Sequence, residues 1–264
     1  MVAEWTNVSP LMQWIAPSAK DTSIATLEKR LWDAADELRA NSGLKAGQYS
    51  QPVLGLIFLR FADARFAACR ATLEKAATGR RGSRVDDAGS YHAAGVLFLP
   101  IEARYGELLE YPEGGKNKKT LGQAVDDAMR GIEHENPQLS GVLPKRYQQF
   151  NARLLKELLK TFSLIPMDLE GDAFGKIYEY FLGEFAMTEG QGGGEFYTPQ
   201  PIVRLMVEIL EPFQGRVLDP ACGSGGMFVQ SARFVDEHQK NSGGSGISIH
   251  GVEKTDETGQ LCRL

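Results

Sequence analysis

The sequence predicts a mostly α N-terminal domain over residues 1–165, followed by the start of an α/β domain over residues 166–264. In the first part, apolar residues recur every three to four positions, which is the spacing of one face of a helix. In the second part, a short apolar run, a glycine-rich turn and a further helix-periodic segment follow one another. That order of strand, turn and helix is typical of α/β folds.

Composition and charge limit the classes of protein to which this chain can belong. The chain has 264 residues, of which 42% are hydrophobic and 24% charged, as is usual for a globular protein, and no apolar run reaches a membrane span. We expect no signal peptide. Cys69, Cys222 and Cys262 are scattered, which indicates neither disulfides nor a metal site and fits a reducing, cytoplasmic setting. The net charge of −5 argues against strong autonomous DNA binding, although a local patch or a partner subunit could still provide it.

The first part of the chain contains several expected helices. The first is expected to be capped by Asp21 or Thr22, and the second by Ser50, with Pro52 in its first turn, where proline is tolerated. The second helix is expected to continue towards Leu73. Aromatic residues on these faces are interpreted as core. Further helices are expected at 121–135, 146–159 and 172–186, with surface loops at 78–90 and 111–119.

The second part is expected to follow a glycine-rich joint. Its elements, in order, are the joint at 188–194, a helix after Pro199 and Pro201, a buried strand at 216–218, a glycine turn and its helix, a flexible loop at 241–246, and a second strand at 247–252. Each boundary is marked by glycine, proline or small polar residues.

The glycine turn lies in residues 217–227, which read Val-Leu-Asp-Pro-Ala-Cys-Gly-Ser-Gly-Gly-Met. It is not a dinucleotide fingerprint, because Phe228 stands where the third glycine would be, and it is not a P-loop, because no Gly-Lys-Ser/Thr follows. Glu253 ends the next expected strand, where an acidic residue can bind ribose hydroxyls. It lies 30 residues after Gly223 rather than about 20, a surplus that the loop at 241–246 can explain. A solvated strand end is the alternative interpretation of Glu253.

Two motifs carry a resemblance to a known family. Asp219-Pro220 with the following Gly-Ser-Gly resembles the first cofactor motif of DNA amino-methyltransferases, and Glu195-Phe-Tyr-Thr-Pro199 resembles the segment preceding that motif in adenine-specific enzymes. The whole chain resembles the modification (methylation) subunit of type I restriction–modification systems. Further similar segments are Pro52–Phe61, Asp126–Met129, Gly141–Pro144 and Ile177–Phe181.

The resemblance implies a helical N-terminal domain before a Rossmann-type methyltransferase domain whose cofactor is S-adenosylmethionine. Thr198 could offer its hydroxyl to the amino-acid end of the cofactor, Asp219 suits its ammonium group, and Glu253 would hold the ribose. Phe196 or Tyr197 could pack on the cofactor, and core packing is the alternative for either ring.

By matching position, the resemblance implies a complete set of cofactor-binding residues. They are Glu195, Phe196, Tyr197, Thr198, Pro199, Gln200, Asp219, Ala221, Gly223, Ser224, Gly225, Gly226 and Glu253. Gln200 departs from the arginine that is more usual at its position, which leaves its own contact open.

The sequence lacks the Asn/Asp-Pro-Pro-aromatic loop with which this group of enzymes holds a flipped-out base. Asn136-Pro137 continues with Gln138, and Asp219-Pro220 belongs to the cofactor turn. No catalytic residue is therefore assigned. We expect the 264 residues to be the N-terminal part of a methyltransferase subunit, to be inactive alone and to expose an unpaired strand edge.

The first functional hypothesis is an adenine-specific DNA methyltransferase subunit that acts on DNA within a complex with a DNA-specificity subunit and a restriction subunit. The alternative is a helical docking module for a specificity subunit or DNA, with a vestigial cofactor site. A nucleotide-dependent oxidoreductase is disfavoured by Phe228 and by residues 195–199. Two basic loops, at 80–84 and 116–119, could meet phosphates, but solvated loops are the preferred interpretation.

Overall fold

The computed structural model describes residues 19–40, 43–44, 46–76, 84–166, 173–188, 198–238 and 246–263. The named elements of the first part of the chain are all helices. Its elements are α1 (Ala19–Ala40), α2 (Ala46–Ala76), η2 (Arg84–Asp86), α3 (Ala88–Ala93), η3 (Ile101–Ala103), α4 (Tyr105–Glu110), α5 (Leu121–Glu135), η4 (Pro137–Leu139), η5 (Tyr147–Gln149), α6 (Ala152–Ser163) and α7 (Ala173–Thr188). The second part contains α8 (Gln200–Leu210), β1 (Gly215–Asp219), α9 (Gly226–His238), β2 (Ile247–Gly251) and α10 (Asp256–Arg263).

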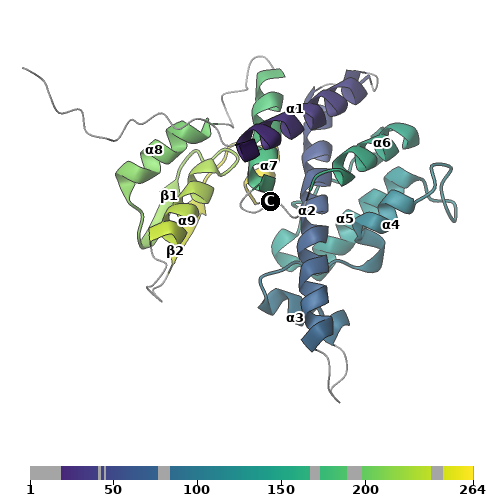
Figure 1. The fold of residues 1–264 in the computed structure, drawn as a ribbon, viewed down its shortest axis with the longest axis horizontal. Helices are drawn as coiled ribbons and strands as arrows, with labels where there is room; N and C mark the ends of the chain where they lie inside the picture. Colours follow the sequence, from purple (N-terminus) through teal and green to yellow (C-terminus); the bar gives the residue numbers. More distant parts are fainter. Residues whose placement is uncertain are drawn as a thin grey trace, which may run out of the picture.

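Two separate cores underlie these two parts. A large apolar core runs from α1 to α7 around the long helix α2, and a much smaller one joins α8 to α9 through Val203, Val207 and Phe234. Figure 1 shows α8, β1, α9 and β2 grouped to one side of the helical part. A side-chain hydrogen bond joins the two parts, from Arg263 Nη2 to the carbonyl of Gln138 at 3.3 Å.

Aromatic packing closes the centre of the large core. The Trp32 ring on α1 meets the rings of Phe181 and Phe185 on α7 edge-on, at centroid distances of 5.5 and 5.0 Å. Edge-to-face contacts of this kind add to the stabilisation that comes from burying the rings. The interpretation of the helical aromatic residues as core is therefore confirmed for these three residues.

Four buried tyrosines hold the helical elements together through their hydroxyl groups. Each side chain is 2% exposed or less, so its hydroxyl needs a partner inside the protein. Each hydroxyl donates to a backbone carbonyl of a different element: Tyr49 to Ala35 (2.6 Å), Tyr91 to Val85 (2.7 Å), Tyr105 to Leu159 (2.8 Å) and Tyr147 to Pro52 (3.0 Å).

The prediction that Ser50 caps the second helix is wrong, because α2 begins at Ala46 and Pro52 lies inside it. Proline has no N–H, so the carbonyl four residues earlier, that of Gln48, loses its helical donor. The Gln149 side chain replaces this donor, with Nε2 2.9 Å from the Gln48 carbonyl oxygen. A tertiary contact thus permits proline in the helix interior.

Other predicted boundaries also shift. Helix α1 begins at Ala19, so neither Asp21 nor Thr22 is its cap. The helix predicted at 146–159 is instead η5 followed by α6, which Asn151 caps by accepting a hydrogen bond from the Leu154 N–H at 3.0 Å. Part of the loop predicted at 78–90 is helical, forming η2 and the start of α3, and its residues 78–83 lie outside the described ranges.

The helix at 121–135 and the loop at 111–119 are confirmed, and α7 closely matches the helix predicted at 172–186. The joint at 188–194 and the loop at 241–246 lie outside the described residues, except for Thr188 and Gly246.

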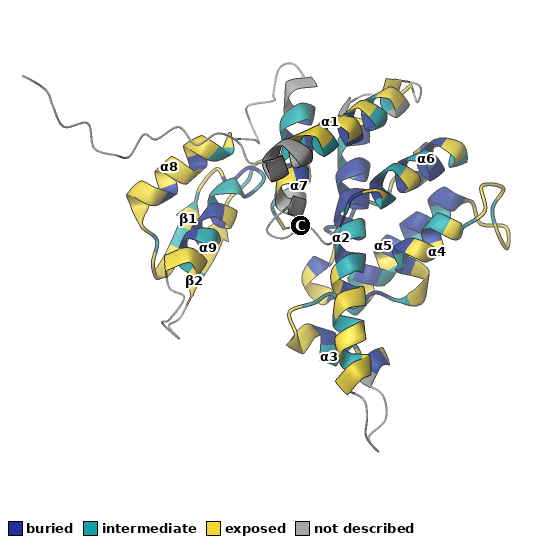
Figure 2. Ribbon diagram, in the orientation of Figure 1, coloured by how far each residue is buried: buried dark blue, intermediate teal, exposed yellow. Residues whose placement is uncertain are grey.

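The strands form a two-stranded parallel sheet, with Gly215 beside Ile247 and Asp219 beside Gly251. The predicted order of strand, glycine turn, helix and strand is therefore present. The expectation that the first strand is buried is wrong, because Leu218 on β1 is 66% exposed. On the second strand, Ile249 is 42% exposed. Helix α9 packs against the sheet, but the described residues leave the strand side chains largely exposed (Figure 2).

Every helix in the described ranges is too short or too polar to span a lipid bilayer.

Asn136 ties α5 to the segment around Phe98. Its buried side-chain oxygen accepts from the Phe98 N–H (3.0 Å), and its Nδ2 donates to the carbonyls of Phe98 (2.9 Å) and Ile132 (2.7 Å). His92 Nε2 lies 3.0 Å from the same side-chain oxygen. Asn136-Pro137 therefore has a structural role here.

We predict that Asn136→Ala lowers the free energy of unfolding by about 2–4 kcal/mol, because it leaves buried backbone groups without partners. Urea denaturation followed by far-UV circular dichroism measures this loss. The neighbouring exposed residue offers a control, and Gln138→Ala should change the unfolding free energy by less than about 0.5 kcal/mol. Equal stability of the two variants would contradict the structural role of Asn136.

Candidate functional site

The candidate site is the turn between β1 and α9, together with the residues that follow β2. Because the strands are parallel, their carboxyl ends lie at the same edge of the sheet. Pairing continues past the strands, with the Val252 N–H donating to the Asp219 carbonyl (2.9 Å) and the Cys222 N–H to the Val252 carbonyl (3.0 Å). The glycine turn is thereby attached to the end of β2, and Asp219 and Glu253 come from neighbouring strand ends.

Glu253 binds the backbone of the turn directly. Its Oε2 accepts from the Gly223 N–H at 3.1 Å, and its Oε1 accepts from the Thr255 N–H at 2.9 Å. These bonds, with that from Thr255 contributing most, hold the pKa of the Glu253 carboxyl below its usual range. Glu253 is therefore ionised at neutral pH. Each carboxylate oxygen accepts about two hydrogen bonds, so acceptor capacity remains for a ligand.

Asp219 closes the other side of the turn. Its Oδ1 accepts from the Ala221 N–H at 3.0 Å, and its side chain is only partly buried. Two carboxylates thus stand at the ends of adjacent strands, one at the start of the turn and one opposite its first glycine. Such a pair suits a ligand that carries both an ammonium group and hydroxyl groups.

Gly225 occupies a position that only glycine fits well. Its φ is +87°, in the region that L side chains rarely adopt, and a Cβ there would lie 2.9 Å from the Cys262 Sγ. Gly223 also has a positive φ, of +55°. Gly223 and Gly225 are thus needed for the backbone conformation of the turn, and Gly225 is also needed for the close approach of α10.

Sequence reasoning missed the contribution of α10. The Cys262 thiol lies against Gly225 and beside the Cys222 thiol. Burial, together with Cys222, raises the pKa of Cys262 to about 12, so the thiol stays protonated and packs as a small apolar group. Thr255 was also missed, although it donates to Glu253. The Cys262 contact has no local sequence signal, because it forms only when α10 packs on the turn. The Thr255 contact, by contrast, is local, since Thr255 lies two residues after Glu253.

The structure places part of the predicted 195–200 segment near the turn. The Pro199 carbonyl accepts from the Val203 N–H at 3.2 Å at the start of α8, and Val203 in turn faces Gly226, the first residue of α9. Thr198 is exposed and Gln200 is half-buried. Among the described residues, the side chains of Thr198 and Gln200 make no hydrogen bond to the turn. Glu195, Phe196 and Tyr197 lie outside the described residues.

The remaining predicted positions lie within the turn itself, namely Ala221, Ser224 and Gly226. Ala221 is exposed, while Ser224 and Gly226 are partly buried. Within the described ranges, no group of three or more His, Cys, Asp or Glu side chains could hold a metal ion. The arrangement can bind a small ligand through backbone and carboxylate groups.

Comparison with protein families matches both parts of the chain. Residues 27–162, just over half of the chain, match the family described as the HsdM N-terminal domain. Residues 169–264, which include the candidate site, match the family described as N-6 DNA methylase.

Individual relatives agree with these matches. The MjaIX methylase subunit of a type I restriction enzyme from Methanocaldococcus jannaschii is 37% identical over 79% of this chain, and the HindI methylase subunit from Haemophilus influenzae is 41% identical over 59% of it. This chain spans 39% and 37% of the lengths of these two relatives. A Vibrio vulnificus protein described as a type I restriction enzyme modification subunit shares the fold, with a TM-score of 0.55, 20% identity, and coverage of 94% of this chain and 54% of its own.

We predict that Glu253→Gln speeds amide hydrogen exchange at Gly223 or Thr255, because the single oxygen of the glutamine amide accepts less well than the two carboxylate oxygens. Since the folded-state pKa is lowered, the wild-type stabilisation is complete above the ordinary value of 4.5 and is lost as pH falls through the lowered value. Exchange measured by NMR across this acidic range tests both points.

The control for this experiment is Asp236→Asn, which changes an exposed carboxylate on α9. It should leave exchange at Gly223 and Thr255 unchanged at every pH. Identical exchange at both amides in wild type and Glu253→Gln would show that the two hydrogen bonds do not hold the turn.

Proposed function

The chain belongs to the family of type I restriction enzyme methylase subunits, and we propose that it serves site-specific methylation of DNA adenine with S-adenosylmethionine as methyl donor. The observation that carries the proposal is the Glu253 carboxylate bound to the glycine turn within the segment that matches N-6 DNA methylases. Because the chain covers less than half the length of the relatives above, the activity of the whole enzyme is part of the proposal.

The chemistry of the donor set fits this cofactor. S-adenosylmethionine carries an ammonium group, a ribose diol and a sulfonium methyl group that can be transferred to an amine. We assign the ammonium group to Asp219 and the ribose hydroxyls to Glu253, since both carboxylates stand at the carboxyl edge of the sheet. The glycines from Gly223 to Gly226 leave the backbone open to close approach.

The 195–200 segment would complete the site from the side of α8. Thr198 and Gln200 stand at the start of this helix, which packs on α9 beside the turn. We propose that Thr198 binds the amino-acid end of the cofactor, that Glu195, Phe196 and Tyr197 contribute to the same wall, and that Pro199 fixes the start of α8. The site would hold and orient the cofactor, and the protein would contribute mainly positioning and electrostatics.

These 264 residues lack the segment with which this group of enzymes holds the adenine that accepts the methyl group. They contain no Asn/Asp-Pro-Pro-aromatic segment, and the nearest candidate, Asn136-Pro137, is used in the helical core. We therefore propose that the chain does not methylate DNA by itself. DNA would be engaged in a complex with a DNA-specificity subunit and a restriction subunit.

The two hydrophobic cores differ greatly in extent, and this difference favours a second function. The helical part has an extensive buried core, whereas α8 leaves Leu205, Ile209 and Leu210 more than half exposed. A helical module that docks a specificity subunit or DNA, beside an incomplete cofactor site, would have these properties. We propose a boundary between the modules near residue 165, between the two matched segments.

We predict that calorimetric titration of the full chain with S-adenosylmethionine gives saturable binding, which Glu253→Gln weakens and Gly225→Leu abolishes. The leucine would clash with Cys262 at a positive φ, whereas Glu253→Gln removes charge without a clash. Gly246→Leu is the matched control, because no atom lies within 4 Å of a Cβ at that position. Equal affinity in all four proteins would contradict the assigned site, and no binding by wild type would favour the docking module.

We also predict that the purified chain transfers no tritiated methyl group from S-adenosylmethionine to duplex DNA above a protein-free blank. A complete DNA adenine methyltransferase run in parallel shows that the assay can detect transfer. Transfer by the wild-type chain that is lost in Glu253→Gln would overturn the proposed inactivity while supporting the cofactor site.

A further inference from the structure

The helical part contains a cavity that the proposed methylation does not use. Its volume is about 670 Å³, within the range of ligand and peptide sites, and it lies between η3, α4, the 111–119 turn and α5. Four carboxylates and two lysines line it, together with apolar side chains from these elements.

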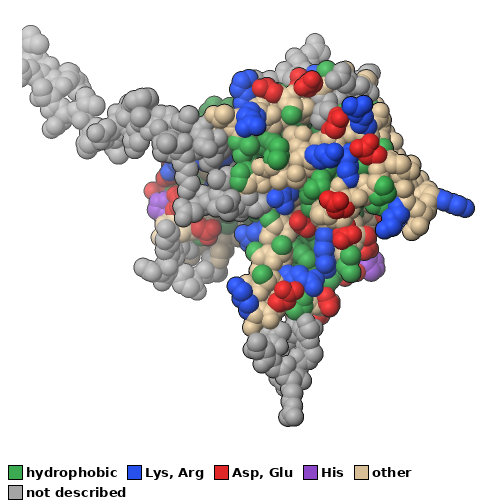
Figure 3. Space-filling view, turned by 45° about the vertical axis from the view of Figure 1, so that its right-hand side comes forward, with side chains coloured by type: hydrophobic (Ala, Val, Ile, Leu, Met, Phe, Trp, Pro, Cys, Tyr) green, Lys and Arg blue, Asp and Glu red, His purple; other side chains and the backbone are tan. Residues whose placement is uncertain are grey.

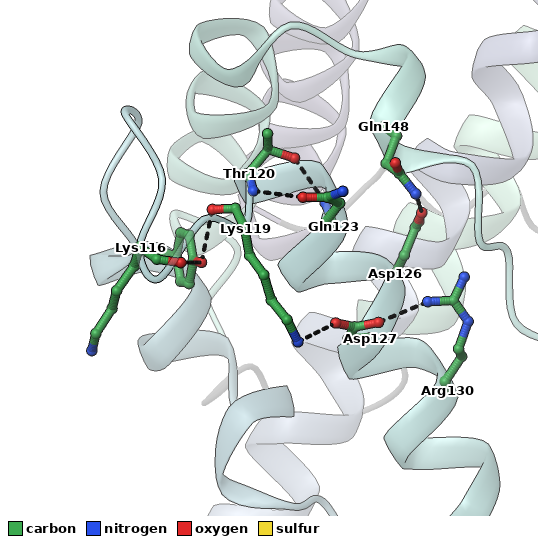
Figure 4. A network of polar contacts seen from close by, with 9 residues as sticks. Lys116, Lys119, Thr120, Gln123, Asp126, Asp127, Arg130 and Gln148 are labelled. Atoms are coloured by element: carbon green, nitrogen blue, oxygen red, sulfur yellow. Dashed lines mark hydrogen bonds and ion pairs between the residues drawn. The ribbon is translucent and has the colours of Figure 1, made fainter.

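Three of the four carboxylates have no cationic partner among the described residues. Glu102, Glu107 and Glu110 are exposed, and none lies within 4.0 Å of a described lysine, arginine or histidine nitrogen. The fourth, Asp127, is already paired with Lys119 Nζ and Arg130 Nη1, each at 2.7 Å (Figure 4). The cavity therefore keeps a net negative charge.

The two lysines of the cavity do not neutralise the three glutamates. Lys119 is bound to Asp127, and the Lys116 side chain extends away from that pair in Figure 4. Lys156, which lies nearby, donates to the carbonyls of Leu109 and Tyr111. Like charges that share one cavity raise each other's energy, so a cationic ligand would be attracted.

The cavity also offers apolar surface. Ile101 is 62% exposed, and Tyr111, Pro112 and Ala124 also belong to the lining. A ligand that fits has cationic groups and an apolar anchor. A basic, amphipathic protein segment has both, whereas a simple metal ion or polyamine has no apolar anchor.

The walls of the cavity are preformed. The Tyr111 hydroxyl is 3.1 Å from the carbonyls of both Lys116 and Lys119, which also pair with each other through their backbones. Thr120 and Gln123 then form a reciprocal capping box at the start of α5, seen in Figure 4. A preformed site costs little ordering entropy on binding, which favours affinity.

We propose that this cavity docks a basic, amphipathic segment of a partner protein. Nucleic acid is disfavoured, because three unpaired carboxylates would face its phosphates. Figure 3, which brings the side with α4 to α6 forward, shows acidic side chains mixed with basic ones and no continuous basic area on the visible face. The proposal does not depend on the cofactor site. The two relatives above are named as subunits of larger enzymes, which is consistent with a protein partner.

The test is fluorescence anisotropy with a labelled peptide of alternating arginine and leucine, titrated with the full chain. The variant combines Glu102→Gln, Glu107→Gln and Glu110→Gln, and we expect it to bind about fivefold or more weakly. The matched control combines Glu74→Gln, Glu157→Gln and Glu208→Gln, which removes the same charge from exposed ion pairs elsewhere. It should bind within about twofold of wild type.

A second peptide, with serine in place of leucine, separates docking from simple charge attraction. We expect it to bind wild type more weakly than the leucine peptide. The proposal is overturned if wild type does not bind the leucine peptide, if both triple variants lose affinity equally, or if the serine peptide binds as well. It is also overturned if labelled duplex DNA binds the wild-type chain and the cavity variant loses that binding.

Discussion

The fold of the helical part depends on a single constraint, which is that a buried hydroxyl must find an acceptor. Four buried tyrosines meet it by donating to carbonyls of other elements, and the connected pairs are α2 with α1, α3 with η2, α4 with α6, and η5 with α2. A helix that shifted along its neighbour would leave both the hydroxyl and the surrounding backbone without partners, at a cost of several kcal/mol. These bonds therefore fix the packing register, which apolar contacts alone leave loose.

The same constraint explains the polar groups in that core. Asp126 is buried, and it accepts from the Tyr147 N–H and from Gln148 Nε2, both at 2.9 Å. Gln149 supplies the donor that Pro52 removes from α2. Residues that look like surface polar positions in the sequence thus satisfy backbone groups of elements about 20 to 100 positions away.

The second part of the chain is organised differently. Its small core covers one side of α8 and α9, while Leu218 and Ile249 on the strands and Ile209 on α8 remain exposed. Order at the candidate site comes instead from hydrogen bonds, because Glu253, Val252 and Asp219 tie the turn to the strand ends. These hydrogen bonds therefore hold the site in place, although described residues leave part of the surrounding apolar surface uncovered.

The cavity between η3 and α5 adds a feature of opposite character. Its uncompensated carboxylates and exposed Ile101 lie in the part of the chain with the larger core. The two parts thus combine different kinds of surface. One presents polar groups suited to a small ligand, and the other presents charged and apolar groups suited to a protein.

The sequence by itself determined the helical and α/β halves, the glycine turn and the acidic residue at the second strand end, because these depend on local periodicity, backbone conformation and residue order. Only the tertiary structure decided that Pro52 can lie inside α2, since Gln149 supplies the missing donor from a distant position, and that Asp126 binds the backbone of η5. It also decided that Glu253 binds Gly223 and that Cys262 packs on Gly225. Such contacts form between residues far apart in the chain, and no local pattern encodes them.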